Sequence, residues 1–356
     1  MEHLRAEFPV FEHLAYLNAG SNGPVPRRGV EAAERSMRHQ ATAGRGDKAA
    51  FEANGQRIDE LRARISTLLG CACPELALTG STTDGVNAVL NALDFAEGDE
   101  ILTSEEEHPG VLAPLASLRE RRGVEVRLAS FGELAEAVSS QTKLVACSHV
   151  SWMTGQVVNS DALAAADTLV LLDGAQGLGA VPTRVEELGC DFYAASGQKW
   201  LCGPNGLGYL YVRDELAREL PAPWPNYGVL TDSTRAFELD VHPDARRFAI
   251  GFPAPHQIEW GLAALDVLEE GGVDAIHARA ADLADRLAQA LGARVAPRGR
   301  STLVSWEDAD PEATVARLHS EGVVVRNLPS SPYVRASVGA WSVSYTHLTL
   351  PTTPYV

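Results

Sequence analysis

The chain has 356 residues, of which 45% are hydrophobic and 22% charged, and it contains 31 Gly and 20 Pro. This composition is that of a globular protein and argues against fibrous, disordered and membrane-spanning classes. A formal net charge of −17 would repel a phosphate backbone, so we expect no nucleic-acid partner. The length exceeds that of one typical core, which favours one large domain and a smaller one.

The N-terminal segment and the cysteines bear on location. Charged residues interrupt every apolar run of residues 1–17, unlike the pattern of a signal peptide. No apolar stretch approaches the length that crosses a bilayer, so we expect no membrane partner. The cysteines are odd in number, scattered, and without CxxC or zinc-type spacing: Cys71, Cys73, Cys147, Cys190 and Cys202. We therefore expect free thiols and a cytoplasmic location.

Short apolar runs alternate with helical periodicity over most of the chain. After the first run, Val86, Val89 and Leu90 recur at helical spacing. Continuous apolar strands separated by helices indicate a mainly parallel sheet buried on both faces. The runs that we predict as strands are 75–79, 101–103, 143–148, 168–173, 191–195 and 208–212.

The pattern lapses at 221–226 (PAPWPN) and then changes. Helical spacing predicts helices over 256–270 and 273–291. Residues 294–337 alternate short strands with one helix, predicted over 312–319, as in a small α+β domain.

The last thirteen residues, 344–356, contain no Asp, Glu, Lys or Arg, although the rest of the chain is rich in them. They resemble translated adapter or vector sequence, and we interpret them as a non-native tail. The predicted large domain is then 15–255. The predicted small domain comprises 1–14 and 256–343.

A lysine motif follows the strand predicted at 191–195. Ser196-Gly197-Gln198-Lys199 leads into a glycine-rich turn before the next strand. Alone, SxxK is a weak signal, but burial at a strand end lowers the pKa of a lysine ammonium. The neutral amine can then attack an aldehyde.

A carboxylate ends the strand predicted at 168–173. Asp173, followed by Gly-Ala-Gln176, is unfavourable at the end of an all-apolar strand unless it has a cationic partner. The pyridinium nitrogen of pyridoxal phosphate (PLP) is such a partner, and Gln176 could bond the ring hydroxyl. A helix N-cap is the structural alternative for Asp173. No second carboxylate or histidine lies at ligand spacing, so we expect no metal.

Two further segments could serve the same cofactor. Residues 80–83 (GSTT) lie between a strand and a helix, where backbone N–H groups and the helix dipole bind phosphate. Ser196 could add its hydroxyl. His108, just past the strand predicted at 101–103, could stack on a planar ring and relay protons, or could be an ordinary surface histidine.

These segments, in this order, resemble the class V aminotransferase family of fold-type-I PLP enzymes, which includes cysteine desulfurases, kynureninases and isopenicillin-N-epimerase-like proteins. The resemblance runs from Tyr16 to Ser337, and its specific part is 173–176 (DGAQ) with 196–212 (SGQKWLCGPNGLGYLYV). It implies an α/β fold, with a mainly parallel seven-stranded sheet between helices and a small C-terminal α+β domain. It also implies a homodimer with sites at the subunit interface.

The resemblance assigns roles to the cofactor-binding residues. Lys199 would form the Schiff base and act as catalytic base, and Asp173 would bond the pyridinium. His108 would stack on the ring as a second catalytic residue, and Gln176 would bond the ring hydroxyl. The phosphate would be held by Ser81, Thr82 and Ser196. Gln198 stands where the family often has a histidine, which changes the contacts expected there.

The substrate side shows further departures from the family. Arg335 matches the arginine that clamps the substrate carboxylate. Asn18 and Trp152 are predicted substrate contacts, although Trp152 stands where an asparagine is common and core packing is the alternative. Phe252 replaces a threonine that reaches the phosphate across the dimer.

The segment 323–335 (VVVRNLPSSPYVR) is short and has no cysteine. Cysteine desulfurases carry their persulfide-forming thiol on a loop in this region. We therefore predict that this chain does not transfer sulfur through a persulfide of its own.

The resulting prediction is a PLP enzyme that acts on a small amino acid through an external aldimine and a Cα carbanion. Transamination, epimerisation and elimination all stay open. Alternatives are a C–S lyase or a desulfurase with an unexpected thiol, a nucleotide-binding protein, and a catalytically incomplete family member. The glycine turns supply neither GxGxxG nor a Walker lysine, which disfavours nucleotide binding.

Overall fold

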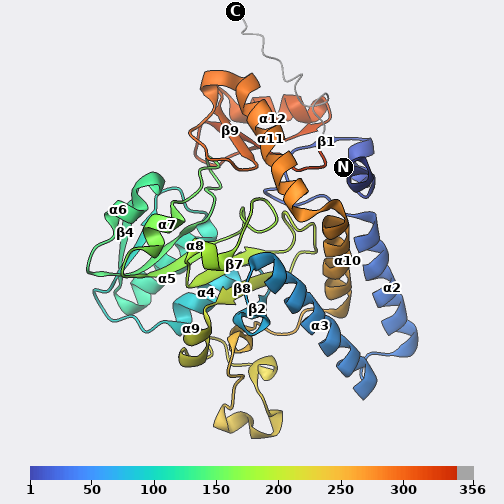
Figure 1. The fold of residues 1–356 in the computed structure, drawn as a ribbon, viewed down its shortest axis with the longest axis vertical. Helices are drawn as coiled ribbons and strands as arrows, with labels where there is room; N and C mark the ends of the chain where they lie inside the picture. Colours follow the sequence, from blue (N-terminus) through green and yellow to red (C-terminus); the bar gives the residue numbers. More distant parts are fainter. Residues whose placement is uncertain (343–356) are drawn as a thin grey trace, which may run out of the picture.

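A computed structural model describes residues 1–342 and places a seven-stranded sheet at the centre of the molecule (Figure 1). The strand order is β2-β8-β7-β6-β5-β3-β4, and only β8 runs antiparallel to its neighbours. The predicted mainly parallel sheet is therefore confirmed. Its strands are β2 (Leu76–Thr79), β3 (Glu100–Ser104), β4 (Glu125–Ala129), β5 (Thr142–Ser148), β6 (Leu169–Asp173), β7 (Phe192–Ser196) and β8 (Gly208–Val212).

Side chains alternate between two cores, one on each face of the sheet. On β5, Leu144 and Ala146 join the core formed with α4 (Thr82–Ala92) and α5 (Pro109–Arg122). Val145 and Cys147 enter the opposite core, which α3 (Lys48–Leu69) covers. This period of two, with both faces buried, explains why the strands read as continuous apolar runs.

The edge strand β4 is the one that the apolar runs did not reveal. Its residues are exposed or half-buried, and Leu128 is 53% exposed. The faces of β4 are only partly covered, so its residues do not form a continuous apolar run, unlike those of the other edge strand, β2, which is buried throughout.

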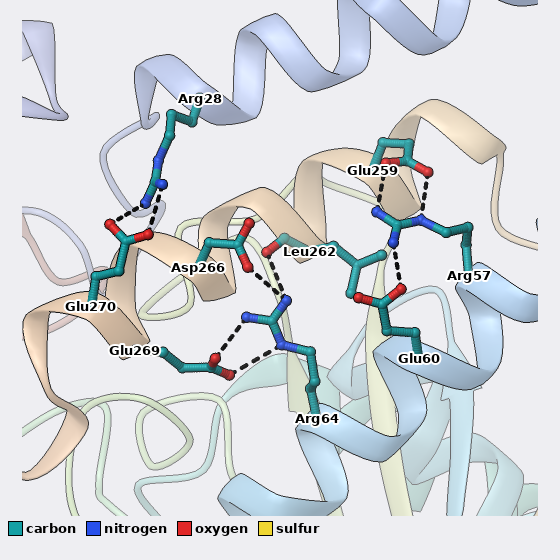
Figure 2. Close-up of polar contacts among 9 residues, drawn as sticks. All are labelled: Arg28, Arg57, Glu60, Arg64, Glu259, Leu262, Asp266, Glu269 and Glu270. Carbon is teal, nitrogen blue, oxygen red and sulfur yellow. Dashed lines mark hydrogen bonds and ion pairs between the residues drawn. The ribbon is translucent and has the colours of Figure 1, made fainter.

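Helix α10 (Pro255–Gly271) packs against α2 (Arg27–Ala43) and α3, beside the sheet (Figure 1). A Cβ on Gly29 of α2 would lie 2.6 Å from Cδ1 of Trp260, so a glycine is needed for this close approach. Arginines of α2 and α3 pair with carboxylates along α10 (Figure 2), in the pairs Arg28–Glu270, Arg57–Glu259, Arg64–Asp266 and Arg64–Glu269.

The small C-terminal α+β domain is also confirmed. Its three-stranded antiparallel sheet has the order β11-β12-β9, and helices α11 and α12 contact these strands. The parallel pair β1–β10 ties the N-terminal segment to this part of the chain. The elements are α11 (Val273–Leu291), β9 (Leu303–Glu307), α12 (Pro311–Ser320), β10 (Val323–Val324), β11 (Arg326–Asn327), β12 (Tyr333–Ser337) and β1 (Ala15–Tyr16).

The division of the chain at residue 255 stays a prediction. Helix α10 packs on two helices of the predicted large domain and leads directly into α11 of the small one.

The predicted tail, 344–356, lies outside the described residues. Within residues 1–342, no helix combines the length and apolarity needed to cross a membrane. The remaining short helices are α1 (Glu2–Ala6), α6 (Leu134–Ala137), α7 (Ser160–Ala164), α8 (Val185–Leu188) and α9 (Asp214–Glu219).

Candidate active site

A cavity of about 340 Å³ opens where β5, β6 and β7 end and α4 begins. The crevice at the carboxyl ends of parallel strands is where α/β proteins commonly bind ligands. All the predicted site residues but Asn18 line it: Ser81, Thr82, His108, Trp152, Asp173, Gln176, Ser196, Gln198, Lys199 and Arg335. The fold thus collects residues from six separate parts of the chain around one space.

Lys199 lies just beyond β7 and faces this cavity. Burial lowers the pKa of its ammonium to about 8, although the negative charge of Asp173 opposes that shift. The backbone is held by Gly23, whose N–H donates to the carbonyl of Gln198 at 2.7 Å. A Cβ on Gly23 would lie 1.9 Å from the carbonyl oxygen of Lys199, so only glycine fits there. The lysine is thereby fixed in place with an amine that deprotonates unusually easily.

Asp173 ends β6 and is 6% exposed. One carboxylate oxygen accepts a hydrogen bond from the N–H of Ala175 at 2.8 Å. Burial raises the pKa of Asp173, and the positive charge of Lys199 opposes that rise. A buried carboxyl of this kind is suited to a cationic ring nitrogen.

The predicted phosphate cradle brings β7 to the start of α4. The N–H of Thr82 donates to Oγ of Ser196 at 2.9 Å, and the two hydroxyl oxygens lie 2.6 Å apart. Ser81 caps α4 by accepting from the N–H of Asp84. Two hydroxyls and a helix N-terminus therefore meet at one end of the cavity, as phosphate binding requires.

The two glutamines of the site differ in how far they are engaged. Gln176 donates to the carbonyl of Gly20 at 2.8 Å and accepts from Nε1 of Trp200 at 3.0 Å. Its contact with a ring hydroxyl stays a prediction. The Oε1 atom of Gln198 is buried without a hydrogen-bond partner. A ligand in the cavity could satisfy it.

His108 is exposed to the cavity and caps α5, with Nδ1 accepting from the N–H of Gly110 at 3.0 Å. Its ring stands edge-on to Trp152, with the centroids 5.1 Å apart. Partial burial and the nearby cations lower its pKa, chiefly Lys199 among the charges. The imidazole is therefore neutral near pH 7, with its proton on Nε2.

Arg335 lies on β12 and is 1% exposed. Its Nη1 donates to the carbonyl of Trp152 at 2.7 Å, whereas Nε and Nη2 have no partner. Buried donors without partners are rare and point to a missing acceptor. A substrate carboxylate would accept from both atoms.

Sequence reasoning missed a second arginine, Arg326 of β11. The β11–β12 register sets it opposite Arg335, and it lines the same cavity. It donates to Oγ of Ser21 at 3.1 Å, and its guanidinium carbon lies 6.0 Å from the ring centroid of Trp152. A second arginine in the segment 323–335, which also contains Arg335, was the signal that could have found it.

Asn18 does not line the cavity. Its side-chain oxygen accepts from Oγ of Ser21 at 2.8 Å, and its backbone bridges to Ser337 of β12. Ser21 and Asn22 line the cavity instead. Contact of Asn18 with a substrate stays a prediction.

None of the five cysteines lines the cavity. Cys147, Cys190 and Cys202 are buried, and burial raises the pKa of each thiol. A thiol must ionise to act as a nucleophile, so these three are chemically unfavourable as sulfur acceptors.

Residues 15–327 match the model of the family Aminotransferase class-V. The chain belongs to this family. It is similar to a cysteine desulfurase of Salmonella gallinarum, at 31% identity over 300 residues, 78% of this chain and 73% of the relative. A cysteine desulfurase of Enterobacter sp. is 30% identical over the same shares.

Among solved structures, the chain resembles C-DES with glycine covalently linked to its PLP cofactor. The TM-score is 0.89 at 26% identity, over 95% of both chains. A second structure pairs "the cystine C-S lyase C-DES" with its reaction product cysteine persulfide. There the TM-score is 0.88 at 25% identity, over 94% of this chain and 96% of the other. The fold is therefore PLP fold type I, and this chain is a PLP-dependent enzyme, as the sequence predicted.

The cavity residues fit that cofactor. The buried Oε1 of Gln198 and two nitrogens of Arg335 lack partners, and the amine of Lys199 has a lowered pKa. Asp173 would hold the ring nitrogen, and Ser81, Thr82 and Ser196 the phosphate. The individual roles of these residues stay predictions.

Proposed function

We propose that this class V enzyme is a carbon–sulfur lyase. It cleaves the Cβ–S bond of a cystine-like amino acid and releases the sulfur without first binding it to a cysteine of its own. The observation that carries the proposal is the cavity itself, which is lined by two arginines and no cysteine. The elimination outcome is thus favoured among those that the family allows.

The absence of a cavity thiol bears on how sulfur leaves. A desulfurase that passes sulfur through its own persulfide needs an ionisable thiol beside the substrate. All five cysteines lie elsewhere in residues 1–342, and the remaining residues contain none. Sulfur would then leave the cavity on the product, as a small molecule.

The two arginines bear on the substrate. Arg335 is fully buried and offers Nε and Nη2 to a carboxylate. Arg326 is half-buried nearer the rim and offers a second positive charge. Cystine carries one carboxylate at each end, so it can engage both guanidinium groups, whereas cysteine can engage only one. The relation to C-DES, described as a cystine C–S lyase, supports the same substrate class.

Each of the cavity residues would have its own role in this reaction. Bound PLP supplies an aldehyde for the lysine and a ring that accepts electrons. Lys199 would take the Cα proton, and the lowered pKa of its amine suits it to that role. Asp173 would keep the ring nitrogen protonated, and the neutral His108 would lie over the ring, where its Nε2–H can donate a hydrogen bond to the leaving sulfur.

The overall reaction balances without an oxidant. One Cβ–S bond of cystine breaks, the sulfur leaves as cysteine persulfide, and hydrolysis of the remaining three-carbon fragment consumes one water. The products are cysteine persulfide, pyruvate and ammonia.

The test is to incubate the PLP-loaded enzyme with cystine and to measure pyruvate and cysteine persulfide. We expect stoichiometric pyruvate, no alanine, and no mass increase on the protein. Alanine from cysteine, together with a persulfide on the protein, would overturn the proposal in favour of a desulfurase. Borohydride reduction of the resting enzyme should fix the cofactor to Lys199, and a Lys199→Ala variant is the control.

We also propose a cytoplasmic homodimer. Large apolar side chains are exposed along residues 224–252, among them Trp224, Phe237 and Phe252, and a second copy would cover them. Five unpaired cysteines suit a reducing compartment. Light scattering should give twice the chain mass of 38.0 kDa; a monomer with full activity would contradict the dimer.

A further inference from the structure

A buried carboxyl lies directly behind the active site. Glu107 is 3% exposed. Its Oε1 accepts from Oγ of Ser104 at 2.9 Å and from the N–H of Ser148 at 3.0 Å, and its Oε2 accepts from Oγ of Ser148. Ser104 ends β3 and Ser148 ends β5, and these strands are neighbours in the sheet. One side chain therefore joins the carboxyl ends of two strands at the cavity.

Two cavity residues depend on this junction. His108 is the next residue in the chain, so a fixed Glu107 also fixes the turn that presents the imidazole. Ser148 lines the cavity and is in register with Asp173 on β6. Glu107 thus touches the turn that carries the expected ring-stacking residue, His108, and the strand end beside the expected partner of the ring nitrogen, Asp173.

The charge of Glu107 has no counterion. Among residues 1–342, no lysine, arginine or histidine forms an ion pair with it. Burial raises the pKa of Glu107 to about 7, with the charge of Asp173 adding to the rise and the Ser148 and Ser104 bonds opposing it. Cys147, one residue before Ser148, also faces it. An unpaired buried carboxyl lowers stability, so a purely structural role would be served as well by a neutral amide.

We propose that Glu107 is a positioning residue of the active site, which holds the His108 turn over the cavity and places a negative charge behind Asp173. As a carboxylate it accepts a hydrogen bond from the Ser148 hydroxyl and keeps that hydroxyl hydrogen turned away from Asp173. When it is protonated it donates to Ser148 instead, and the Ser148 proton becomes free to turn to Asp173. The proposal depends on PLP binding, which the family shows, and not on which substrate reacts.

The test compares Glu107→Gln with Glu107→Ala in the PLP-loaded enzyme without substrate. Glutamine keeps the shape and loses the charge, whereas alanine loses both. With one negative charge gone, we expect the pH midpoint of the cofactor absorbance change to fall by about one pH unit in Glu107→Gln. In Glu107→Ala we also expect PLP affinity to fall by about tenfold, because His108 and Ser148 are released.

Glu105→Gln is the matched control, since it removes an exposed carboxylate from the same turn. It should leave the absorbance profile and PLP affinity unchanged.

A double variant tests whether Glu107 acts through His108. When His108 is already replaced by alanine, changing Glu107 should cause little further loss of PLP affinity. An unchanged absorbance profile in Glu107→Gln would overturn the proposal, as would a Glu107→Ala enzyme that loses only thermal stability. If the alanine variant does not fold, the absorbance midpoint of Glu107→Gln decides by itself. Because no substrate is used, failure here is distinct from failure of the lyase reaction.

Discussion

Arginine occurs in two contrasting settings in this protein. One group lies on α2 and α3 and pairs with carboxylates of α10, and the other lines the cavity, where no carboxylate of the described chain pairs with it. Along α10 each guanidinium meets one or two carboxylates (Figure 2), and hydrogen bonds to Glu270 and Glu259 raise the pKa of Arg28 and Arg57. In the cavity, Arg335 is more deeply buried and has only a carbonyl partner, and burial lowers its pKa to about 9. The charges of the first group are paired with carboxylates within the fold, whereas the charge of Arg335 has no carboxylate partner among residues 1–342.

The contrast indicates that the arginines paired with α10 contribute to stability, whereas those of the cavity serve ligand binding. A buried charge without a counterion opposes folding, so it persists where an outside partner completes it. The arginines of α2 and α3 that pair with α10 are partly exposed, and such ion pairs stabilise a fold by about 1 kcal/mol or less. The two regions should therefore respond in opposite ways to the loss of an arginine.

The largest effect is expected at Arg335. Arg335→Met should lower kcat/KM at least about a hundredfold, because the substrate carboxylate loses its charge-assisted hydrogen bonds. The thermal midpoint should stay the same or rise, because an unpaired buried cation has been removed. Steady-state kinetics and calorimetry measure both. A midpoint several degrees lower would show that Arg335 is a structural residue.

Lys199 should give the apo-protein a distinctive pH dependence. Its pKa is about 8 in the fold against 10.5 as the usual value. Between these values the unfolded chain binds more protons, so the free energy of unfolding should rise with pH from about 8 to about 10.5. The gain is at most about 3 kcal/mol. Denaturant titrations of Lys199→Met should lack this component; equal slopes in both proteins would contradict the shift.

Arg326 should act on one class of substrate. Arg326→Met should raise KM for cystine by about tenfold, since a half-buried charge pair contributes about 1–2 kcal/mol. S-methylcysteine, which has a single carboxylate, serves as the matched substrate and should be affected far less. An equal loss for both would place Arg326 on the α-carboxylate or the cofactor instead.

The smallest effect is expected at Arg64. Arg64→Gln should lower stability by about 1 kcal/mol and leave kcat/KM unchanged, because its partners Asp266 and Glu269 are half-exposed and lie on α10. Half-molar salt should shrink the difference. Denaturant titrations at two salt concentrations test this, with the more exposed pair of Arg38 and Glu34 as the control that should show almost no loss.

The sheet could be predicted well where both of its faces are buried. Strands β5, β6 and β7 read as apolar runs because helices cover them on either side. The edge strand β4 escaped, since an exposed strand carries a mixed pattern. The pairing of β1 with β10 could not be predicted either, because a two-residue strand is too short to show a periodic pattern.

The residues of the candidate site also differ in how far the sequence could predict them. Asp173 and Lys199 could be predicted because the first ends an apolar strand and the second closely follows one, where a charge is unexpected. Arg326 could not, because its place depends on the β11–β12 register that sets it opposite Arg335. Glu107 looked like one acid of an exposed loop, and only the ends of β3 and β5 make it a buried junction.

The sequence by itself determined the buried strands of the sheet, the candidate pair of Lys199 and Asp173, and the lack of a cysteine in the segment before Arg335, because these follow from local pattern and residue type. The tertiary structure alone decided which charges are paired and which are left for a ligand. Pairing depends on distances between residues far apart in the chain, such as Arg64 with Asp266, or Glu107 with Ser148. Composition and periodicity carry no information about those distances.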